Sequence, residues 1–158
     1  MKKLWITVIA IVTLIVLIGV GLFILSKEPI TIDPVEAFLP ELCSNNPYIV
    51  SRVIDGDTFE LCSGDTIRLL CVDTPEKGEQ GYEEAQAFLE DLLLYNEVEL
   101  KESNYDGPNT DKYNRLLRWV YISNSTTGEQ ILVNKYLLEE GYGDILIIPP
   151  ETCNEVAD

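Results

Sequence analysis

The sequence predicts an α+β domain in which a β-sheet dominates. Three observations support this fold class. Short runs rich in β-branched and aromatic residues alternate with turn residues over 48–72 and again over 97–133. Residues 81–95 change to a helical spacing of apolar side chains, and a second helical stretch ends at Gly141. The 158 residues accommodate one such domain with appendages, but no second large domain.

The first strands are separated by compact turns. Residues 48–54 and 58–62 are β-rich and are joined by residues 55–57, Asp-Gly-Asp, which predicts a tight connection. Residues 63–65, Ser-Gly-Asp, then turn the chain into a third strand over 66–72. We therefore expect three successive strands of one sheet.

The rest of the domain mixes helices and strands. In 81–95 apolar residues recur at steps of three and four with acids between them, which is typical of a helix packed by one face. Strands are predicted at 97–102, 115–122 and 130–133, and a second helix at 134–140. Five short strands can curl into a small barrel with a helix at one end, so we expect an OB-type five-stranded β-barrel with helices.

The N-terminal region predicts a transmembrane helix. Residues 4–25 are apolar apart from two threonines, and as a helix they extend roughly 33 Å, which matches a bilayer core. Residues 1–3 carry two lysines, whereas Lys27 and Glu28 nearly cancel after the span, so residues 1–3 are expected in the cytoplasm. We predict a single-pass anchor in the cell membrane with the domain outside it. Secretion after cleavage of a signal peptide is the alternative.

Composition shifts predict the remaining boundaries. Residues 26–47 contain several prolines and indicate a linker, with a short helix at 35–39. The folded domain is expected over 48–148, followed by an acidic tail over 149–158.

The four cysteines, Cys43, Cys62, Cys71 and Cys153, allow three disulfide pairings in an oxidising exterior. If Cys62 faces Ile67 in a hairpin, Cys71 lies about 13 Å further along the strand. A disulfide requires α-carbons within about 7 Å, which disfavours Cys62 with Cys71. Of the two remaining pairings we favour Cys43 with Cys62 and Cys71 with Cys153. Four free buried thiols are the alternative.

Composition also limits the chemistry. The chain contains no histidine, which excludes a Ser-His-Asp triad, a Cys-His pair and histidine-ligated zinc. Any general base must be a carboxylate, a lysine or a tyrosine. The formal net charge is −16, which opposes tight binding of a polyanion.

Polar residues gather at the ends of the predicted strands. Residues 55–57 place two acids in a turn. Residues 73–76 place two acids around a proline after an apolar strand, and residues 111–115 form a charged turn before another apolar strand. Each element alone is as typical of a solvated turn or a salt-bridged loop. Together with Arg68 and Arg115 they supply oxygen ligands for a cation and guanidinium groups for a phosphate.

Four motifs in order, IDGDT, IRLLCVDTPE, DKYNR and VNKYLLEEGYG, resemble the staphylococcal (thermonuclease-type) nuclease family over 48–145. The family's fold is an OB-type barrel with helices. The resemblance implies that Asp57, Asp73 and the main-chain carbonyl of Thr74 bind Ca²⁺, and that Asp55 is an acid behind these ligands.

The same resemblance implies the groups that act on the substrate. Glu76 matches the acid proposed to activate water, Arg68 and Arg115 match the phosphate-binding arginines, and Tyr113 matches a tyrosine near the bound phosphate. Residues 145–149 replace the family's tyrosines that stack on the nucleobase, so we expect a weaker hold on the base.

The sequence thus predicts a membrane-anchored, extracytoplasmic, calcium-dependent nuclease. Its expected substrate is DNA, with RNA as an open alternative, and the implied products carry 3′-phosphates. No protein partner is implied. The alternative function is a non-catalytic OB-type surface module that binds nucleic acid or protein.

Overall fold

The computed structural model describes residues 34–103, 109–124, 126–147 and 153–156. The chain divides into two compact units, Met1–Glu36 and Ala37–Asp158, and the second contains the sheets, the disulfides and the site described below. The predicted membrane span at 4–25 lies outside the described residues. Within the described part, no helix has the length and apolar character needed to cross a membrane.

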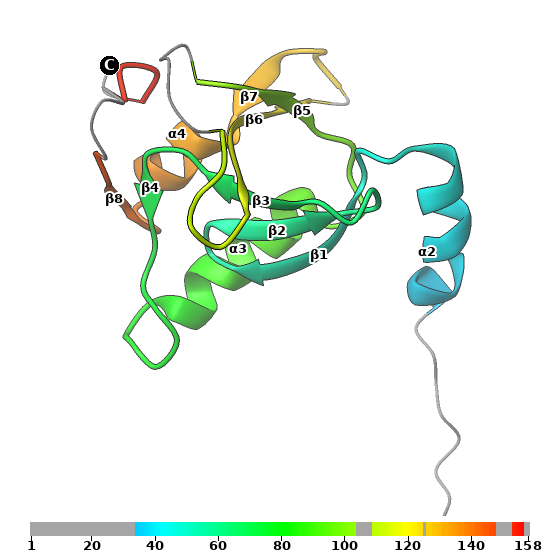
Figure 1. Ribbon diagram of the computed structural model, residues 1–158, viewed down its shortest axis with the longest axis horizontal. Helices are drawn as coiled ribbons and strands as arrows, with labels where there is room; N and C mark the ends of the chain where they lie inside the picture. Colours follow the sequence, from blue (N-terminus) through cyan, green and yellow to red (C-terminus); the bar gives the residue numbers. More distant parts are fainter. Residues whose placement is uncertain (1–33, 104–108, 125, 148–152, 157–158) are drawn as a thin grey trace, which may run out of the picture. The chain divides into compact units, whose positions relative to one another are not determined.

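Six strands form one sheet in the order β1-β2-β3-β6-β5, with β7 also paired to β6 (Figure 1). The strands of this sheet are β1 (Val50–Asp55), β2 (Thr58–Leu61), β3 (Thr66–Leu69), β5 (Glu99–Lys101), β6 (Leu116–Ser123) and β7 (Gln130–Leu132). β3 and β6 run parallel, and Ile67 faces Leu116 in their register. This pairing brings the turn before β6 beside the β2–β3 hairpin.

The strand pairing does not show the closed five-stranded barrel that the sequence predicted. Among the described residues the ladders form an open path from β1 to β5. An isolated bridge between Ile49 and Glu97 joins the segments that precede these two strands. The α+β class with a dominant sheet is confirmed, but this sheet has six strands and its ends meet through a bridge, not through a full ladder.

The single strand predicted over 66–72 is divided in two. β3 ends at Leu69, and β4 (Val72–Asp73) pairs instead with β8 (Asp144–Ile145), a strand that the sequence did not predict. Cys71 adopts the left-handed conformation with φ of 60°, which an extended strand cannot contain. The chain therefore leaves the large sheet just before Asp73.

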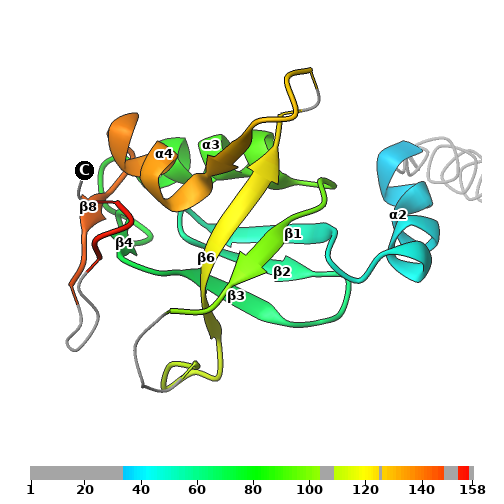
Figure 2. The same ribbon diagram turned by 90° about the horizontal axis from the view of Figure 1, so that it is seen from above.

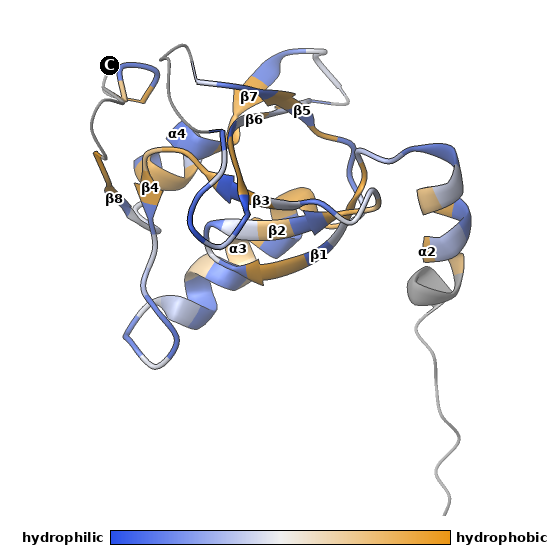
Figure 3. Ribbon diagram, viewed as in Figure 1, coloured by the Kyte–Doolittle hydropathy of each residue, from blue (hydrophilic) through white to orange (hydrophobic). Residues whose placement is uncertain are grey.

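In the described part of the chain, three helices accompany the sheets: α2 (Pro34–Asn45), α3 (Tyr82–Leu93) and α4 (Val133–Glu139). α2 occupies much of the predicted linker and is longer than the helix expected at 35–39. α3 buries Ala85, Leu89 and Leu93, which share one face at helical spacing. Figure 3 shows hydrophobic and hydrophilic residues alternating along the ribbon of α3, and a hydrophilic loop before β6.

Asn134 is the fully buried polar residue on α4. Its Nδ2 donates to the carbonyl of Leu70 at 2.8 Å, and its Oδ1 accepts from the Val120 N–H at 2.9 Å. These bonds satisfy main-chain groups that face the core, where an unpaired polar group is costly. Asn134 thereby connects α4 to the end of β3, next to the break in the strand.

Two disulfides join distant parts of the unit. Cys43 of α2 bonds to Cys62 after β2, and Cys71 bonds to Cys153 near the C-terminus. This is the pairing that the sequence favoured. The second disulfide lies in a small buried cluster with Trp119 and Val156, and Figure 2 shows the C-terminal segment beside β4 and β8.

Candidate active site

The β1–β2 turn presents Asp57 toward the interior. The N–H of Asp57 donates to Oδ1 of Asp55 at 3.1 Å, which closes the turn. A Cβ on Gly56 would lie 2.7 Å from both the Ala85 Cβ and the Thr74 Oγ1. Only glycine allows the turn to approach α3 and Thr74 so closely.

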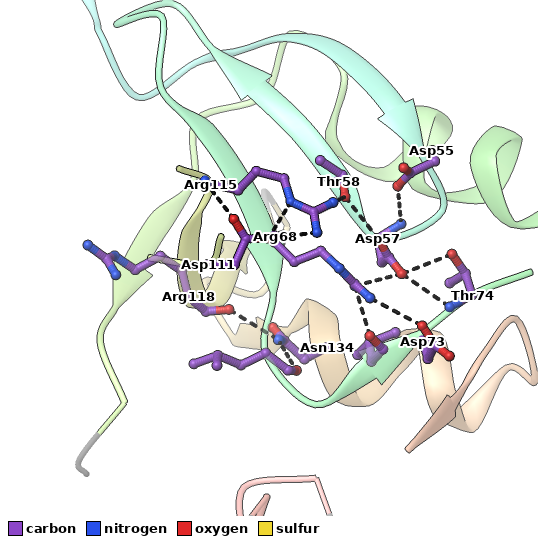
Figure 4. A network of polar contacts seen from close by, with 12 residues as sticks. Asp55, Asp57, Thr58, Arg68, Asp73, Thr74, Asp111, Arg115, Arg118 and Asn134 are labelled. Atoms are coloured by element: carbon purple, nitrogen blue, oxygen red, sulfur yellow. Dashed lines mark hydrogen bonds and ion pairs between the residues drawn. The ribbon is translucent and has the colours of Figure 1, made fainter. Parts of the chain in front are cut away.

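Asp57 is buried, with 5% of its surface exposed, and is surrounded by donors (Figure 4). Its Oδ2 accepts from the N–H and the hydroxyl of Thr74, each at 3.1 Å. Its Oδ1 accepts from the hydroxyl of Thr58 at 2.9 Å. The turn and the segment after β4 are therefore linked through one carboxylate.

Arg68 of β3 joins the two candidate metal ligands. Its Nη1 lies 2.6 Å from Asp57 Oδ2, and its Nη2 lies 3.3 Å from Asp73 Oδ1. Nη1 also donates to the carbonyl of Val72 at 2.8 Å. The guanidinium thus spans the break between β3 and β4, so that both carboxylates converge on one positive charge.

Arg115 approaches the same carboxylate from the turn before β6. Its Nε donates to Asp111 Oδ2 at 2.7 Å, and its Nη1 donates to the Thr58 hydroxyl at 3.2 Å. Asn114 supports this turn with φ of 64°, a conformation that asparagine tolerates well. Asp57, Thr58 and Arg115 therefore form a continuous chain of hydrogen bonds.

Asp111 fixes the Arg115 turn. Its carboxylate also accepts the main-chain N–H groups of Tyr113 and Arg115. Burial by itself raises the pKa of Asp111, but the hydrogen bonds from Arg115 and Tyr113 and the charge of Arg115 outweigh it and hold that pKa below its usual value. Asp111 is therefore a fixed negative partner for Arg115.

Tyr113 is 67% exposed, and its ring lies 5.3 Å from the Arg115 Cζ and 4.8 Å from the Lys112 Nζ. These distances are typical of cation–π contacts. The exposed ring thus stands at the solvent edge of the arginine cluster.

Glu76 lies apart from this cluster. Its main-chain N–H donates to Glu79 Oε2 at 2.8 Å, and its side chain is exposed in the loop that follows Thr74. Within the described ranges, the Glu76 carboxylate forms no hydrogen bond or ion pair with the residues around Asp57. A pocket of about 270 Å³ lies beside this loop, between residues 73–75 and 141–144.

The structure therefore brings together Asp55, Asp57, Arg68, Asp73, Thr74 and Arg115 in one polar network, with Tyr113 at its edge. Sequence reasoning missed two members, Thr58 and Asp111. Thr58 follows Asp57 directly, and Asp111 precedes Arg115 by four residues, so both belonged to the motifs. Neither residue type signals a bridging role by itself.

Burial raises the pKa of Asp57 to about 6, the charge of Arg68 opposes this rise, and the carboxylate of Asp55 adds to it. Burying the Asp57 carboxylate as an anion is therefore costly even beside Arg68. No group of three His, Cys, Asp or Glu side chains suited to a metal ion occurs among the described residues. Two carboxylates with a carbonyl and water would nevertheless fit Ca²⁺, which accepts hard oxygen ligands and partial hydration.

Asp57 also predicts a pH dependence of stability. Its folded-state pKa of about 6 lies above the 3.8 of an ordinary aspartate, so the folded protein holds this proton more tightly than the unfolded chain. That stabilisation is fully present below about pH 4 and is lost as pH rises through about 6. Without divalent cations, we expect the loss of this stabilisation to lower the free energy of unfolding by about 3 kcal/mol between these two pH values.

Urea denaturation of the wild type, Asp57→Asn and Asp91→Asn at several pH values measures this contribution. Asp91 is an exposed acid of α3 and serves as the matched control. Asp57→Asn should lack the decline, whereas Asp91→Asn should keep it. An equal decline in all three proteins would contradict the raised pKa.

The fold and this network define a small disulfide-linked α+β domain with a carboxylate and guanidinium site at the end of a β-hairpin. The chain belongs to the staphylococcal nuclease homologue family, whose model matches residues 66–155. The matched residues include Arg68, Asp73 and Arg115. Residues 55–57 precede the match, and the network of Asp57 joins them to it.

Three curated proteins show the same similarity. Endonuclease YncB of Bacillus subtilis (strain 168) is 36% identical over 91 residues, which cover 52% of this chain and 43% of that protein. SPbeta prophage-derived endonuclease YokF of the same organism is 34% identical over 91 residues, covering 52% and 30%. Thermonuclease of Staphylococcus intermedius is 33% identical over 112 residues, covering 65% and 61%. The chain thus spans less than two thirds of each relative.

Proposed function

We propose that the protein is a calcium-dependent nuclease that hydrolyses phosphodiester bonds of DNA, with RNA as a second candidate substrate. The observation that carries this proposal is the approach of Arg68 and Arg115 to one buried carboxylate. Arg68 contacts Asp57 directly, and Arg115 reaches it through the Thr58 hydroxyl. The similarity to two endonucleases and a thermonuclease supports the same activity.

Asp57, Asp73 and the Thr74 carbonyl would hold the cation. When bound, Ca²⁺ supplies positive charge that offsets the charge developing on the phosphate. Thr74 is suited to this position because its N–H and hydroxyl already bind Asp57. These contacts hold its main chain next to the first carboxylate.

Arg68 and Arg115 would donate to the non-bridging oxygens of the phosphate. Phosphoryl transfer depends mainly on positioning and on neutralisation of these oxygens, and guanidinium groups suit both tasks. Asp111 holds Nε and Nη2 of Arg115 on one side, and Nη1 donates one hydrogen to Thr58. The second hydrogens of Nη1 and Nη2 would donate to the substrate. Tyr113 would lie against the bound phosphate from the solvent side.

Glu76 would accept a proton from the attacking water. The water oxygen bonds to phosphorus, the bond from phosphorus to the 5′ oxygen breaks, and the leaving oxygen takes up a proton. The products are a 3′-phosphate and a 5′-hydroxyl. Because the Glu76 side chain is exposed in the structure, we propose that it turns toward the network when substrate binds.

A non-catalytic OB-type surface module that binds nucleic acid or protein is the alternative. The separation of the Glu76 carboxylate from the network and the net charge of −16 favour it. For either function, the negative charge of the protein implies weak, non-specific binding of nucleic acid with a preference for flexible single strands. Salt or divalent cations would assist this binding because they screen the repulsion between the two negative charges. A module of this kind would bind without releasing nucleotides.

We further propose that residues 4–25 anchor the protein in the cell membrane, with residues 26–47 as a linker, 48–148 as the nuclease domain outside, and 149–158 as an acidic tail. The apolar run and its flanking lysines support the anchor. The two disulfides support an oxidising compartment. Mass spectrometry of the mature protein would separate the anchor from the secreted alternative, because cleavage removes the first residues.

Nucleotide release by the full chain tests the proposed activity. We expect acid-soluble nucleotides from DNA in Ca²⁺ and none after chelation with EGTA. Asp73→Asn should raise the calcium concentration required for half-maximal rate by at least about tenfold, because one of two anionic ligands is lost. Asp144→Asn removes the exposed acid that pairs with Asp73 across β4 and β8 and should leave that concentration nearly unchanged.

The outcome separates the two candidate functions. Release that depends on Ca²⁺ and on Asp73 supports the nuclease. Binding of DNA without release, at every calcium and salt concentration, would overturn it in favour of the surface module.

A further inference from the structure

We propose that Cys71 and Cys153 are positioning residues for the proposed active site. Their disulfide holds the segment that carries Asp73 and Thr74 against Asp57, and its reduction releases that segment. The inference rests on the proposed function because it concerns the same candidate metal ligands. It goes further in making the activity depend on the redox state of one cysteine pair.

The position of Cys71 is the first argument. It lies two residues before Asp73, at the point where the chain leaves the large sheet. Its φ of 60° sets the direction in which β4 leaves the sheet. A residue other than glycine keeps this left-handed conformation only when the surrounding structure holds it there. The residue before it is fixed to the sheet, since the Leu70 N–H donates to the Arg118 carbonyl at 3.0 Å. Cys71 is thus the joint, by which we mean the residue that connects the fixed strand β3 to the segment carrying Asp73 and Thr74.

The segment after this joint has few supports of its own. β4 consists of two residues and pairs with β8, which also has two, both exposed. An isolated two-stranded pair is marginally stable in water even when it is longer. The Leu146 N–H adds one bond to the Cys71 carbonyl at 3.2 Å. Val72 itself packs into the hydrophobic core. Beyond Val72, the contacts of Arg68 with Asp73 and of Thr74 with Asp57 are those that substrate and cation would rearrange.

The disulfide supplies the support that these short strands lack. Cys71 and Cys153 are 6% and 1% exposed and share a buried cluster with Trp119 and Val156. The bond connects positions separated by 82 residues, so it ties the C-terminal segment to the joint.

Reduction by a dithiol such as dithiothreitol has a defined balance. The dithiol loses two electrons and two protons and closes its own disulfide. The bond between the Sγ atoms of Cys71 and Cys153 breaks, and each sulfur becomes a thiol. The two thiols can then separate, which frees both the C-terminal segment and the joint.

Paired cysteine variants of the full chain test the inference. Cys71→Ser/Cys153→Ser removes this disulfide, and Cys43→Ser/Cys62→Ser removes the other and serves as the matched control. Cys43 and Cys62 join α2 to the end of β2, away from Asp73 in the chain. Hydrogen exchange of the peptide over 72–74 reports the segment without any metal, and calcium titration reports the ligand geometry.

We expect the Cys71 and Cys153 variant to exchange the 72–74 amides about 10- to 100-fold faster and to bind calcium about 10- to 100-fold more weakly. The control variant should match the wild type in both measurements. Brief treatment of the folded Cys43→Ser/Cys62→Ser variant with dithiothreitol, which leaves only the Cys71–Cys153 bond to be reduced, should reproduce the first result and keeps the test valid if the other serine variant folds poorly. It should also shift the emission of Trp119, measured in a Trp5→Phe background.

Unchanged exchange over 72–74 after loss or reduction of this disulfide would overturn the inference, even if the protein is a nuclease. Faster exchange confined to this disulfide would support it, even if none of the proteins cleaves DNA. The failure of the positioning role and the failure of the proposed function are therefore distinguishable.

Discussion

Replacing Glu76 by glutamine is expected to lower the rate of nucleotide release about 100- to 10,000-fold, with little change in stability. An aligned general base contributes a rate factor of this size, and glutamine keeps the shape of the side chain while it removes the base. Because Glu76 is exposed and its carboxylate makes no ion pair among the described residues, the folded domain should not depend on its charge. Single-turnover cleavage of a labelled oligonucleotide at saturating Ca²⁺ measures the effect on the chemical step.

Glu90→Gln provides the matched control for this measurement. Glu90 is an exposed acid of α3, so the variant makes the same charge change on the same unit. Its rate should equal that of the wild type. A Glu76→Gln protein that cleaves as fast as the Glu90→Gln protein would exclude Glu76 as the base.

Replacing Arg68 by alanine is expected to damage both stability and activity. The Arg68 side chain is 12% exposed, and the Asp57 side chain that it contacts at 2.6 Å is 7% exposed. Removal of one partner leaves a buried carboxylate without compensation, which typically costs about 3–5 kcal/mol. Urea denaturation at neutral pH without divalent cations measures this loss, and Ca²⁺ should restore part of it.

Two further variants identify the cause of that loss. Arg52→Ala breaks an ion pair with Glu60, but the Arg52 side chain is 65% exposed, so solvent screens the pair and its loss should cost far less stability than Arg68→Ala. Arg68→Ala/Asp57→Asn removes both charges and should be more stable than Arg68→Ala alone. Equal stability of Arg52→Ala and Arg68→Ala would show that the buried pair contributes nothing unusual.

Much of the site could be predicted because its residues sit at strand ends. Asp57 lies directly before β2 and Arg68 lies in β3, so the hairpin of these two strands brings them close together. Their contact required only the correct strand order. The partners of Arg115 could not be predicted in this way, since the hydrogen bond to Thr58 depends on the parallel pairing of β3 with β6.

The division of the third strand shows a second limit. Residues 66–72 are uniformly β-rich, and local propensity contains no signal for a break. The left-handed Cys71 and the pairing of Val72 with Ile145 are imposed by tertiary contacts. β8 was missed for the same reason, because two exposed residues acquire a strand conformation only from their partner. α2 is likewise longer than predicted, because the prolines in this segment indicated a linker with only a short helix at 35–39.

The parallel pairing of β3 with β6 has a consequence for the order of folding. β1, β2 and β3 follow one another in antiparallel contact, so Asp57 and Arg68 can meet early through short-range hairpins. Ile67 and Leu116 are distant in the chain, and their contact requires closure of a long loop, which is slow. We therefore expect Arg115 to join the site after Asp57 and Arg68 have met. A partly folded chain would already hold Asp57 against one arginine, but it would lack the second guanidinium until the long loop has closed.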